Sequence, residues 1–425
     1  MPKLNGFTKK EILEVYYKMS LSRALDEKML ILLKQGKSFF HMGASGHEAA
    51  QLAAASLIKE GKDWSYPYYR DSAYCLGLGM TAREQLLSFL SKADDPNSGG
   101  RQMPMHYGHK DLRIISQSSP TGSQFLQALG SALAAQYDDS NDIVYVSSGE
   151  GTTSQGDFHE ALNWASNSKA PIIFHIQDNE YAISTHRSEQ SADSVYTRAA
   201  GYKNLTRYDV DGTDFFETHL AFKKACERGR KGQGPSVIIS NVVRLLPHSS
   251  SDDQRKYRTK DDLSQDLERD PLLILKNQCL EKKFISEKEF ENITSQVKEQ
   301  INTDVIWADE QSYPDESTAL DHIYSMDPPI AESTFKPIRD SVVIVDAINH
   351  ALKEEMAIND KMIIYGQDIA DPKGGVFTAT KGLSDEFGMK RVFNSPLAES
   401  SIVGTAIGLA VTGYKPVIEI QFGDY

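Results

Sequence analysis

Apolar positions along the chain follow helical spacing in some segments and form short continuous runs in others. From Lys9 to Lys34 apolar residues recur at helical spacing with polar residues on the opposite face, which predicts an amphipathic helix. Residues 214–231 show a second amphipathic pattern. Because strands that alternate with helices form parallel sheets with covered faces, the pattern predicts an α/β domain. Short runs rich in β-branched residues mark the strands, at residues 143–146, 172–176, 207–210 and 235–243.

The pattern changes in the last third of the chain. Prolines mark a connector before Ser341, where a new series of helix and strand patterns begins. In this series, helices are expected at residues 345–356 and 402–410, and strands at residues 362–365 and 416–422. The last strand runs to the end of the sequence, so the second unit is expected to be only part of a domain. The predicted organisation is an α/β domain over residues 1–301, a linker over 302–340 and a partial second domain over 341–425.

Composition narrows the kinds of partner. The chain has 425 residues, of which 40% are hydrophobic and 25% charged, as expected for a globular protein of two or three domains. A net charge of -13 argues against nucleic acid as the main partner, although a local basic cluster can still bind an anionic cofactor. Cys75, Cys226 and Cys279 lack metal-binding spacing, so reduced core thiols are expected. With neither a signal-peptide core nor a membrane-spanning apolar run, the sequence predicts a cytoplasmic protein that does not enter a membrane.

Two predicted strands end in polar residues that suit a metal ion. Gly149, Glu150 and Gly151 follow the strand at 143–146, and Asn179 follows the strand at 172–176. Open α/β sheets bind ligands at the carboxyl ends of their strands, so adjacent parallel strands would bring Glu150 and Asn179 to one edge. A carboxylate, an amide oxygen and a backbone carbonyl are hard ligands that suit Mg²⁺, which takes its remaining ligands from water or phosphate. The alternative is an ordinary strand–turn–helix loop with an incidental acid.

Several further polar loops have two readings each. His41 and His47 flank a loop of small residues and either face a ligand or serve as satisfied structural histidines. Arg70 follows four aromatic or proline residues and is either a ligand contact or a surface arginine. Residues 116–124 carry hydroxyls and carbonyls that either hold a monovalent cation or cap the helix starting near Gln124. The loop at 244–253 has one imidazole at its head, His248, and is otherwise a solvated Ser/Asp segment.

Taken together, these loops resemble the thiamine-diphosphate-dependent first component of the 2-oxo acid dehydrogenase complexes. Residues 10–300 are similar to its α subunit, and residues 341–425 are similar to the start of its β subunit. The matching α-type motifs are Tyr-Arg at 69–70, Gly-Arg-Gln-Met-Pro at 100–104, Ser-Ser-Pro at 118–120, Gly-Glu-Gly at 149–151, the segment at 179–185 and the segment at 248–253. The matching β-type motifs are those at 374–377, 381–383, 396–399 and 419–422. The resemblance implies an α–β fusion with a thiamine-diphosphate-binding fold, in which a parallel sheet is flanked by helices and is followed by a partial domain of the same type.

The resemblance also implies roles for individual residues. Catalytic roles fall to His248, which would donate a proton or stabilise the intermediate at the mouth of the site, and to Glu399, as the carboxylate that pairs with the aminopyrimidine ring. Mg²⁺ would be bound by Glu150, Asn179 and the Tyr181 carbonyl, and a K⁺-type site would use Ser118, Pro120, Ser123 and Gln124. Cofactor contacts are expected at Tyr69, Arg70, Ser119, Thr121, Gly149, Glu150, Gly151, Thr152, Asn179, Tyr181, Ala182, His248 and Glu399.

Two positions depart from the family pattern. An arginine common two residues before the asparagine is Gln177 here, which removes one diphosphate contact. A leucine that usually supports the bent cofactor is Thr121. The missing remainder of the β part should carry further active-site histidines, so activity is expected of the full-length chain.

The function implied is oxidative decarboxylation of a 2-oxo acid with transfer of the acyl group to lipoyl-lysine of a dihydrolipoyl acyltransferase. Glu150 in place of aspartate, the loop at 101–104 and the His248 loop favour a branched-chain substrate, 2-oxoisovalerate, and a 3-methyl-2-oxobutanoate dehydrogenase activity. Pyruvate or acetoin is the alternative substrate within the family, and a homo-oligomer is expected. A transketolase-type carbon transfer and a non-enzymatic assembly subunit are the rival classes.

Overall fold

The computed structural model describes residues 2–323 and 341–425, and it confirms the predicted α/β class. Two compact units divide between Pro314 and Asp315, and each is described by itself. Our finer division at residues 301 and 340 stays a prediction, and part of the expected linker lies outside the described residues. The helix that follows residue 286 continues through residue 301 to Asp309.

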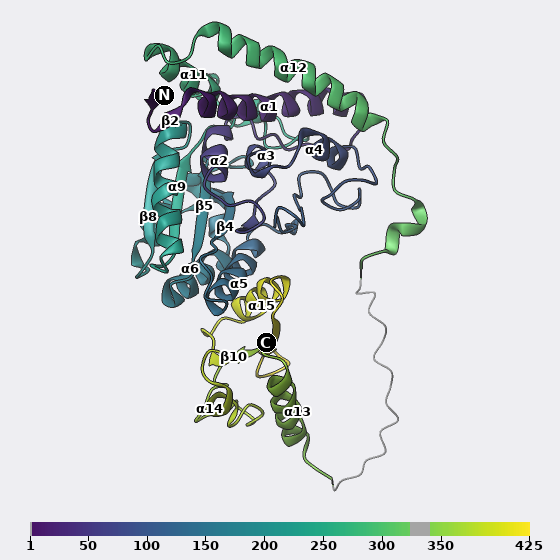
Figure 1. Ribbon diagram of the computed structural model, residues 1–425, viewed down its shortest axis with the longest axis vertical. Helices are drawn as coiled ribbons and strands as arrows, with labels where there is room; N and C mark the ends of the chain where they lie inside the picture. The colour runs from purple at the N-terminus through teal and green to yellow at the C-terminus, as the bar shows by residue number, and fades with distance from the viewer. Residues whose placement is uncertain (1, 324–340) are drawn as a thin grey trace. The chain divides into compact units, whose positions relative to one another are not determined.

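A five-stranded parallel sheet forms the centre of the first unit (Figure 1). Its strand order is β3-β4-β5-β9-β8, and every neighbouring pair is parallel. The strands are β3 (Trp64–Tyr66), β4 (Val144–Gly149), β5 (Ile172–Asp178), β8 (Thr206–Asp211) and β9 (Ser236–Asn241). All seven residues of β5 are buried, as expected for a central strand covered on both faces. The sequence pattern located four of these strands but missed β3, whose three residues are too few to show a period.

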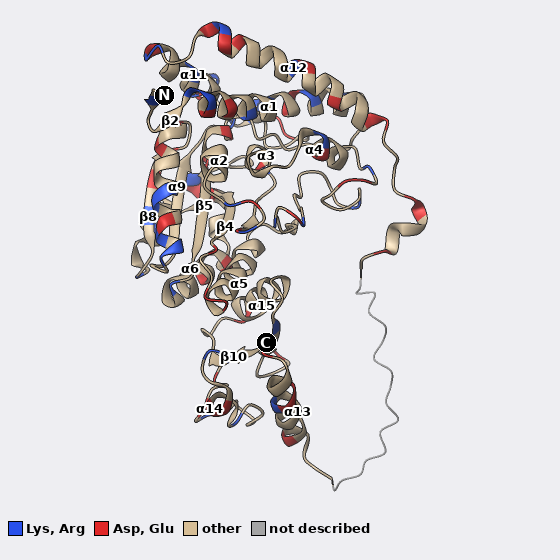
Figure 2. Ribbon diagram, in the orientation of Figure 1, with Lys and Arg blue, Asp and Glu red and all other residues tan. Residues whose placement is uncertain are grey.

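Helices cover this sheet, and α1 lies alongside α12 (Figure 1). The long helices are α1 (Lys9–Lys34), α5 (Ser123–Tyr137), α6 (Gly156–Ser168), α9 (Phe215–Arg230) and α12 (Glu287–Asp309). Thr8 and Glu11 form a capping box that starts α1 at its predicted residue. Acidic and basic side chains are interspersed along α1, α9 and α12 (Figure 2). The shorter helices are α2 (Glu48–Ala55), α3 (Ser72–Leu78), α4 (Ala82–Phe89), α7 (Arg187–Gln190), α8 (Val195–Arg198), α10 (Lys260–Glu268) and α11 (Pro271–Glu281).

Pro271 separates two helices. α10 ends at Glu268, and α11 begins on Pro271. Proline suits the first turn of a helix because its missing N–H would have no partner there. The remaining short elements of the first unit are β1 (Lys3–Leu4), β2 (Phe7–Thr8), η1 (Glu150–Ser154), β6 (Tyr181–Ala182), β7 (Thr185–His186), η2 (Ala199–Gly201) and η3 (Gln254–Lys256).

The second unit is built on a three-stranded parallel sheet of order β11-β10-β12. Its strands are β10 (Met362–Gly366), β11 (Val392–Asn394) and β12 (Lys415–Glu419), and its helices are η4 (Glu316–Leu320), α13 (Ile344–Ile358), α14 (Leu383–Phe387) and α15 (Glu399–Val411). Two predicted boundaries shift. β12 ends at Glu419 rather than Phe422, because Glu419 pairs with Gly366, the last residue of its partner strand. α15 begins at Glu399 rather than Ile402, and a carboxylate in the first turn is favourable there.

The core prediction for the thiols is confirmed. Cys75, Cys226 and Cys279 are all buried and free. None of the helices in the described ranges combines the length and apolar character needed to cross a membrane.

Candidate cofactor and metal site

The register of β4 and β5 brings the two predicted metal-binding positions together. Gly149, at the end of β4, pairs with Gln177 near the end of β5. Glu150 follows in η1, and Asn179 follows β5. The Asn179 backbone N–H donates to Glu150 Oε2 at 3.4 Å. The two side chains therefore emerge at one edge of the sheet, as the sequence predicted.

Glu150 is a buried carboxylate with one oxygen free. Its side chain belongs to a residue that is only 4% exposed, and Oε1 has no hydrogen-bond partner. Burial raises the pKa of Glu150 to about 7, and the nearby Asp178 carboxylate adds to the rise. An orphaned acidic oxygen of this kind is expensive to bury, so the geometry suits a cation that binds there.

A tight hairpin carries Tyr181, and Asn179 lies two residues before it. Strands β6 and β7 pair antiparallel, with Tyr181 opposite His186. Glu180 and Ile183 have positive φ angles of 71° and 58°, which turn the chain sharply on either side of β6. The Tyr181 N–H donates to Asn179 Oδ1 at 3.3 Å, so the amide and the Tyr181 backbone are held side by side.

Positive charge is buried beside these oxygens. Arg70 and Arg244 are 2% and 1% exposed, and no carboxylate among the described residues pairs with either. Arg70 Nε and both Nε and Nη1 of Arg244 lack hydrogen-bond partners. Burial and the neighbouring Arg70 lower the pKa of Arg244. Two buried, unpaired guanidinium groups are costly, so they favour a bound anion.

His248 lies against Arg70. Arg70 Nη2 is 3.4 Å from His248 Nδ1 and donates to the His248 carbonyl oxygen at 3.3 Å. Burial, with Arg70 and Arg244 nearby, lowers the pKa of His248 to about 3. The ring is therefore neutral near pH 7, and because Nδ1 faces a guanidinium donor, its proton belongs on Nε2. A hydrogen bond within the loop also holds His248 in place, since the His248 N–H donates to Asp252 Oδ2 at 2.8 Å.

These groups surround a cavity of about 280 Å³. It receives eleven of the thirteen predicted cofactor residues, together with Tyr68 and Ile183, which the sequence did not single out. The two that do not line it are Ser119, which is hydrogen-bonded to His106 at 2.9 Å, and Glu399, which belongs to the second unit. Lining residues are Tyr68, Tyr69, Arg70, Thr121, Gly149, Glu150, Gly151, Thr152, Asn179, Tyr181, Ala182, Ile183 and His248.

Arg244 was missed by sequence reasoning. Its Nη2 donates to the Ile183 carbonyl at 3.1 Å and to the Tyr257 hydroxyl at 2.7 Å, so it lies next to the cavity wall. A signal existed, because Arg244 follows directly after the apolar run that forms β9, and the carboxyl end of a parallel strand is where ligands bind.

Gln177, the departure from the family pattern, is fully buried below the cavity. Its Oε1 is 2.8 Å from His47 Nδ1, and its Nε2 donates to Asp71 Oδ1 at 2.6 Å. Burial raises the pKa of Asp71 to about 7, and burial also lowers the pKa of His47. The Gln177 amide thus hydrogen-bonds to two buried groups whose pKa values are shifted toward the neutral form. An arginine at this position would add a full positive charge.

His41 and the hydroxyl-rich loop at 118–124 each had two interpretations from the sequence. His41 is buried and hydrogen-bonded to Asp26 at 3.2 Å, which fits its structural reading. In the loop at 118–124, Ser118 Oγ and Ser123 Oγ are hydrogen-bonded, and Ser123 Oγ donates to the Pro120 carbonyl at 3.1 Å. Gln124 braces the same loop, since its Oε1 accepts the Gly122 N–H at 2.9 Å while its Nε2 donates to the Ser147 carbonyl at 3.2 Å. The oxygens of Ser118, Pro120 and Ser123 therefore gather in this loop.

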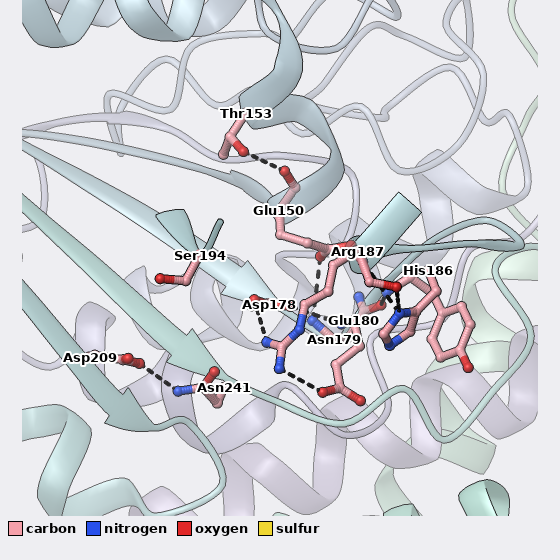
Figure 3. Close-up of polar contacts among 12 residues, drawn as sticks. Glu150, Thr153, Asp178, Asn179, Glu180, His186, Arg187, Ser194, Asp209 and Asn241 are labelled. Atoms are coloured by element: carbon pink, nitrogen blue, oxygen red, sulfur yellow. Dashed lines mark hydrogen bonds and ion pairs between the residues drawn. The ribbon is translucent and has the colours of Figure 1, made fainter. Parts of the chain in front are cut away.

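A second cavity, of about 490 Å³, also has Glu150 on its wall. It is lined by Asp178, Asp193 and Asp209 as well as Glu150, and Arg187 is the one cation among the described residues on its wall. Figure 3 shows Arg187 reaching toward both Asp178 and Glu180.

An orphaned carboxylate oxygen, an adjacent amide, a backbone hairpin and unpaired buried arginines suit a divalent cation with a polyphosphate. Their place, at the carboxyl ends of parallel strands in an α/β domain followed by a second one, is that of a thiamine-diphosphate-binding protein. Comparison with known proteins agrees. The model of the family described as "Dehydrogenase E1 component" matches residues 16–317, and that of "Transketolase, pyrimidine binding domain" matches residues 340–425.

Individual relatives give the same result. The chain is 38% identical over 321 residues to the 2-oxoisovalerate dehydrogenase subunit alpha of Bacillus subtilis, which covers 75% of this chain and 97% of that protein. It is 32% identical over 307 residues to the pyruvate dehydrogenase E1 component subunit alpha of Staphylococcus aureus, with 70% and 80% covered. The corresponding Staphylococcus epidermidis protein is 30% identical over 318 residues, with 75% and 83% covered. The chain therefore belongs to the dehydrogenase E1 component family, and it carries a transketolase-type pyrimidine-binding domain.

Proposed function

We propose that this protein catalyses the thiamine-diphosphate-dependent oxidative decarboxylation of a branched-chain 2-oxo acid, 2-oxoisovalerate, as an α–β fusion. The acyl group passes to lipoyl-lysine of a dihydrolipoyl acyltransferase partner. The protein works in the cytoplasm as a homo-oligomer. The observation that carries the proposal is the cavity at the ends of β4 and β5. It is lined by Glu150, which has a free carboxylate oxygen, and by Arg70, and Arg244 adjoins it through a hydrogen bond to the Ile183 carbonyl.

In this proposal, oxygen ligands bind the metal ion and the two arginines bind the diphosphate. Glu150 Oε1, the Asn179 amide and the Tyr181 carbonyl would hold Mg²⁺, an ion that suits such oxygen ligands together with phosphate oxygens. Arg70 and Arg244 neutralise the diphosphate, which offsets the cost of burying them. Arg244 compensates for the arginine that Gln177 replaces. When bound, thiamine diphosphate supplies a carbon nucleophile and an electron sink for the loss of CO₂.

The residues of this chain then bind, orient and move protons. His248 presents Nε2–H as a donor near the mouth of the cavity. Glu399, in the second unit, accepts a hydrogen bond from Gln367 Nε2 at 2.8 Å, which fixes the carboxyl group that we assign to the aminopyrimidine ring. Ser119 contributes through the hydroxyl loop rather than by direct contact. The oxygens of Ser118, Pro120 and Ser123 hold K⁺, with Gln124 bracing the loop.

Substrate choice is tested on the full-length gene product by following reduction of an artificial dye acceptor. We expect kcat/KM for 2-oxoisovalerate to exceed that for pyruvate by roughly 10-fold or more, because a pocket fitted to a branched side chain gains that much from each additional buried methyl-sized group. If pyruvate is turned over faster, the branched-chain assignment is wrong while the E1 reaction stands. If sugar phosphates alone act as donors, the reaction itself is of the transketolase type.

Metal binding should depend on pH in a defined direction. Because burial raises the pKa of Glu150 to about 7, the carboxyl group is protonated below that pH and the metal must displace a proton. Affinity should therefore fall as the pH drops below 7 and stay level above it, with binding at pH 6 about 10-fold weaker than at pH 8. Calorimetric titration with Mn²⁺ alone avoids the ionisations of the cofactor. Equal affinity at the two pH values would contradict a ligand role for Glu150.

A further inference from the structure

Arg187 bridges the two acidic residues on either side of Asn179. Its Nη1 donates to Asp178 Oδ2 at 3.0 Å, and its Nη2 lies 3.0 Å from Glu180 Oε1 (Figure 3). Asp178 is the last residue of β5, and Glu180 is the first residue beyond Asn179. One guanidinium group therefore spans the segment in which the proposed amide ligand lies.

The backbone of Arg187 closes the same segment. Its N–H donates to the Glu180 carbonyl at 2.8 Å, at the base of the β6–β7 hairpin. The other oxygen of Asp178, Oδ1, accepts the Glu180 N–H at 2.9 Å. Asp178 and Arg187 thus bind Glu180 from two sides, and the hairpin that carries the Tyr181 carbonyl starts from this fixed point.

Burial determines which of the two ion pairs matters. The side chains of Arg187 and Glu180 are 41% and 51% exposed, so their pair is screened by water and contributes little. The Asp178 side chain is only 5% exposed, and it lies close enough to Glu150 to disfavour the charge there. Removing a partner from a buried carboxylate is far more costly than losing an exposed pair. Asp178 is therefore the group that requires Arg187.

We propose that Arg187 is a positioning residue for the metal site, which holds Asn179 and the Tyr181 carbonyl in place by binding Asp178 and Glu180. The inference rests on the proposed cofactor function and deepens it. Arg187 lies on the wall of the second cavity. The ligands that it orients, Asn179 and Tyr181, line the cofactor cavity instead. Partners that orient metal ligands in this way typically change metal affinity on the order of 10- to 100-fold.

The test uses five variants of the full chain. Arg187→Gln removes the clamp, Arg187→Lys keeps the charge without the planar fork, and Asp178→Asn removes the buried charge. The double variant Asp178→Asn/Arg187→Gln removes both charges. Arg83→Gln is the matched control, because Arg83 has a side chain 44% exposed and pairs with Asp304 at 2.6 Å between α4 and α12, outside both cavities.

Two measurements are made on each variant. Calorimetry gives the affinity for thiamine diphosphate at saturating Mg²⁺. Amide hydrogen exchange without ligands reports how firmly residues 179–187 are held. Arg187→Gln is expected to weaken cofactor binding by about 10- to 100-fold and to speed exchange in this segment, with exchange elsewhere unchanged. Arg83→Gln should leave both properties of the site unchanged.

Rescue separates charge compensation from general loss of structure. Arg187→Lys and the double variant should each regain most of the affinity, to within about 3- to 5-fold of the wild type, because neither leaves Asp178 unpaired. Wild-type affinity in Arg187→Gln, or a double variant as weak as Arg187→Gln alone, would overturn the assignment. If the wild type binds no cofactor, the proposed function fails and the positioning role fails with it. If amide hydrogen exchange in residues 179–187 is unchanged in Arg187→Gln, the positioning role of Arg187 is wrong while the proposed function stands.

Discussion

Glu150→Gln is expected to abolish Mg²⁺-dependent binding of thiamine diphosphate. The substitution keeps the size of the side chain and its contact with the Asn179 N–H, but it removes the only carboxylate that we assign to the metal. The neutral amide also loses the attraction that an ionised oxygen gives to a divalent cation. Because we propose that magnesium links the protein to the diphosphate, we expect the cofactor to be lost together with the metal.

Calorimetric titration with thiamine diphosphate and Mg²⁺ measures this effect. Glu299→Gln, an exposed change on α12, supplies the control and should bind as the wild type does. Glu150→Gln should also be more stable than the wild type without ligands near pH 8, because the folded state then no longer holds an unfavourable buried charge. Unaltered cofactor affinity in Glu150→Gln would refute the assignment of Glu150 as a ligand.

The sequence was sufficient for the arrangement of the site because strand ends are encoded locally. Glu150 and Asn179 each follow an apolar run, and parallel pairing of β4 with β5 then brings them together without further information. Hydrophobic spacing similarly located α1 and α9 to within a residue or so, since each buries one apolar face. Such features depend on neighbours within a few residues.

Other features depend on long-range contacts. The place of Arg244 after the apolar run of β9 was a sequence signal, but the burial of its side chain without a carboxylate is visible only in the structure. The inward position of Gln177 is explained by His47 and Asp71, residues more than a hundred positions away. Ser119 was expected to touch the cofactor, yet His106 holds its hydroxyl outside the cavity lining. Arg187 likewise reads as an ordinary polar residue until Asp178 and Glu180 are seen around it.

The acidic and basic halves of the cavity also explain why this chain can lack the usual arginine at Gln177. A third guanidinium beside Arg70 and Arg244 would add repulsion in a buried place, where burial and Arg70 already lower the pKa of Arg244. A neutral amide at Gln177 avoids this repulsion and connects Asp71 to His47 instead. Under the proposed function, Arg70 and Arg244 supply the positive charge for the diphosphate, and Gln177 adds none.

His248→Asn is expected to lower turnover of 2-oxoisovalerate by about 10²- to 10⁴-fold, which is the usual contribution of a positioned proton donor. The effect should appear in kcat, with cofactor affinity changed far less, because Arg70 and Arg244 remain to bind the diphosphate. Dye-linked activity assays and calorimetry on the same preparation separate the two quantities. Ser251→Ala, an exposed change in the same loop, is the control for loop structure and should retain activity.

The ionisation of His248 gives this prediction a second, independent readout. Because burial and the two arginines lower the pKa of His248 to about 3, the ring stays neutral and keeps its single proton on Nε2 throughout the working range. At saturating metal and cofactor, protonation of His248 should therefore produce no inflection in the rate between about pH 5 and pH 8, where an ordinary histidine titrates. An inflection in that range that is present in the wild type and absent in His248→Asn would show that the ring ionises there, and the role of His248 as a neutral donor would have to be abandoned.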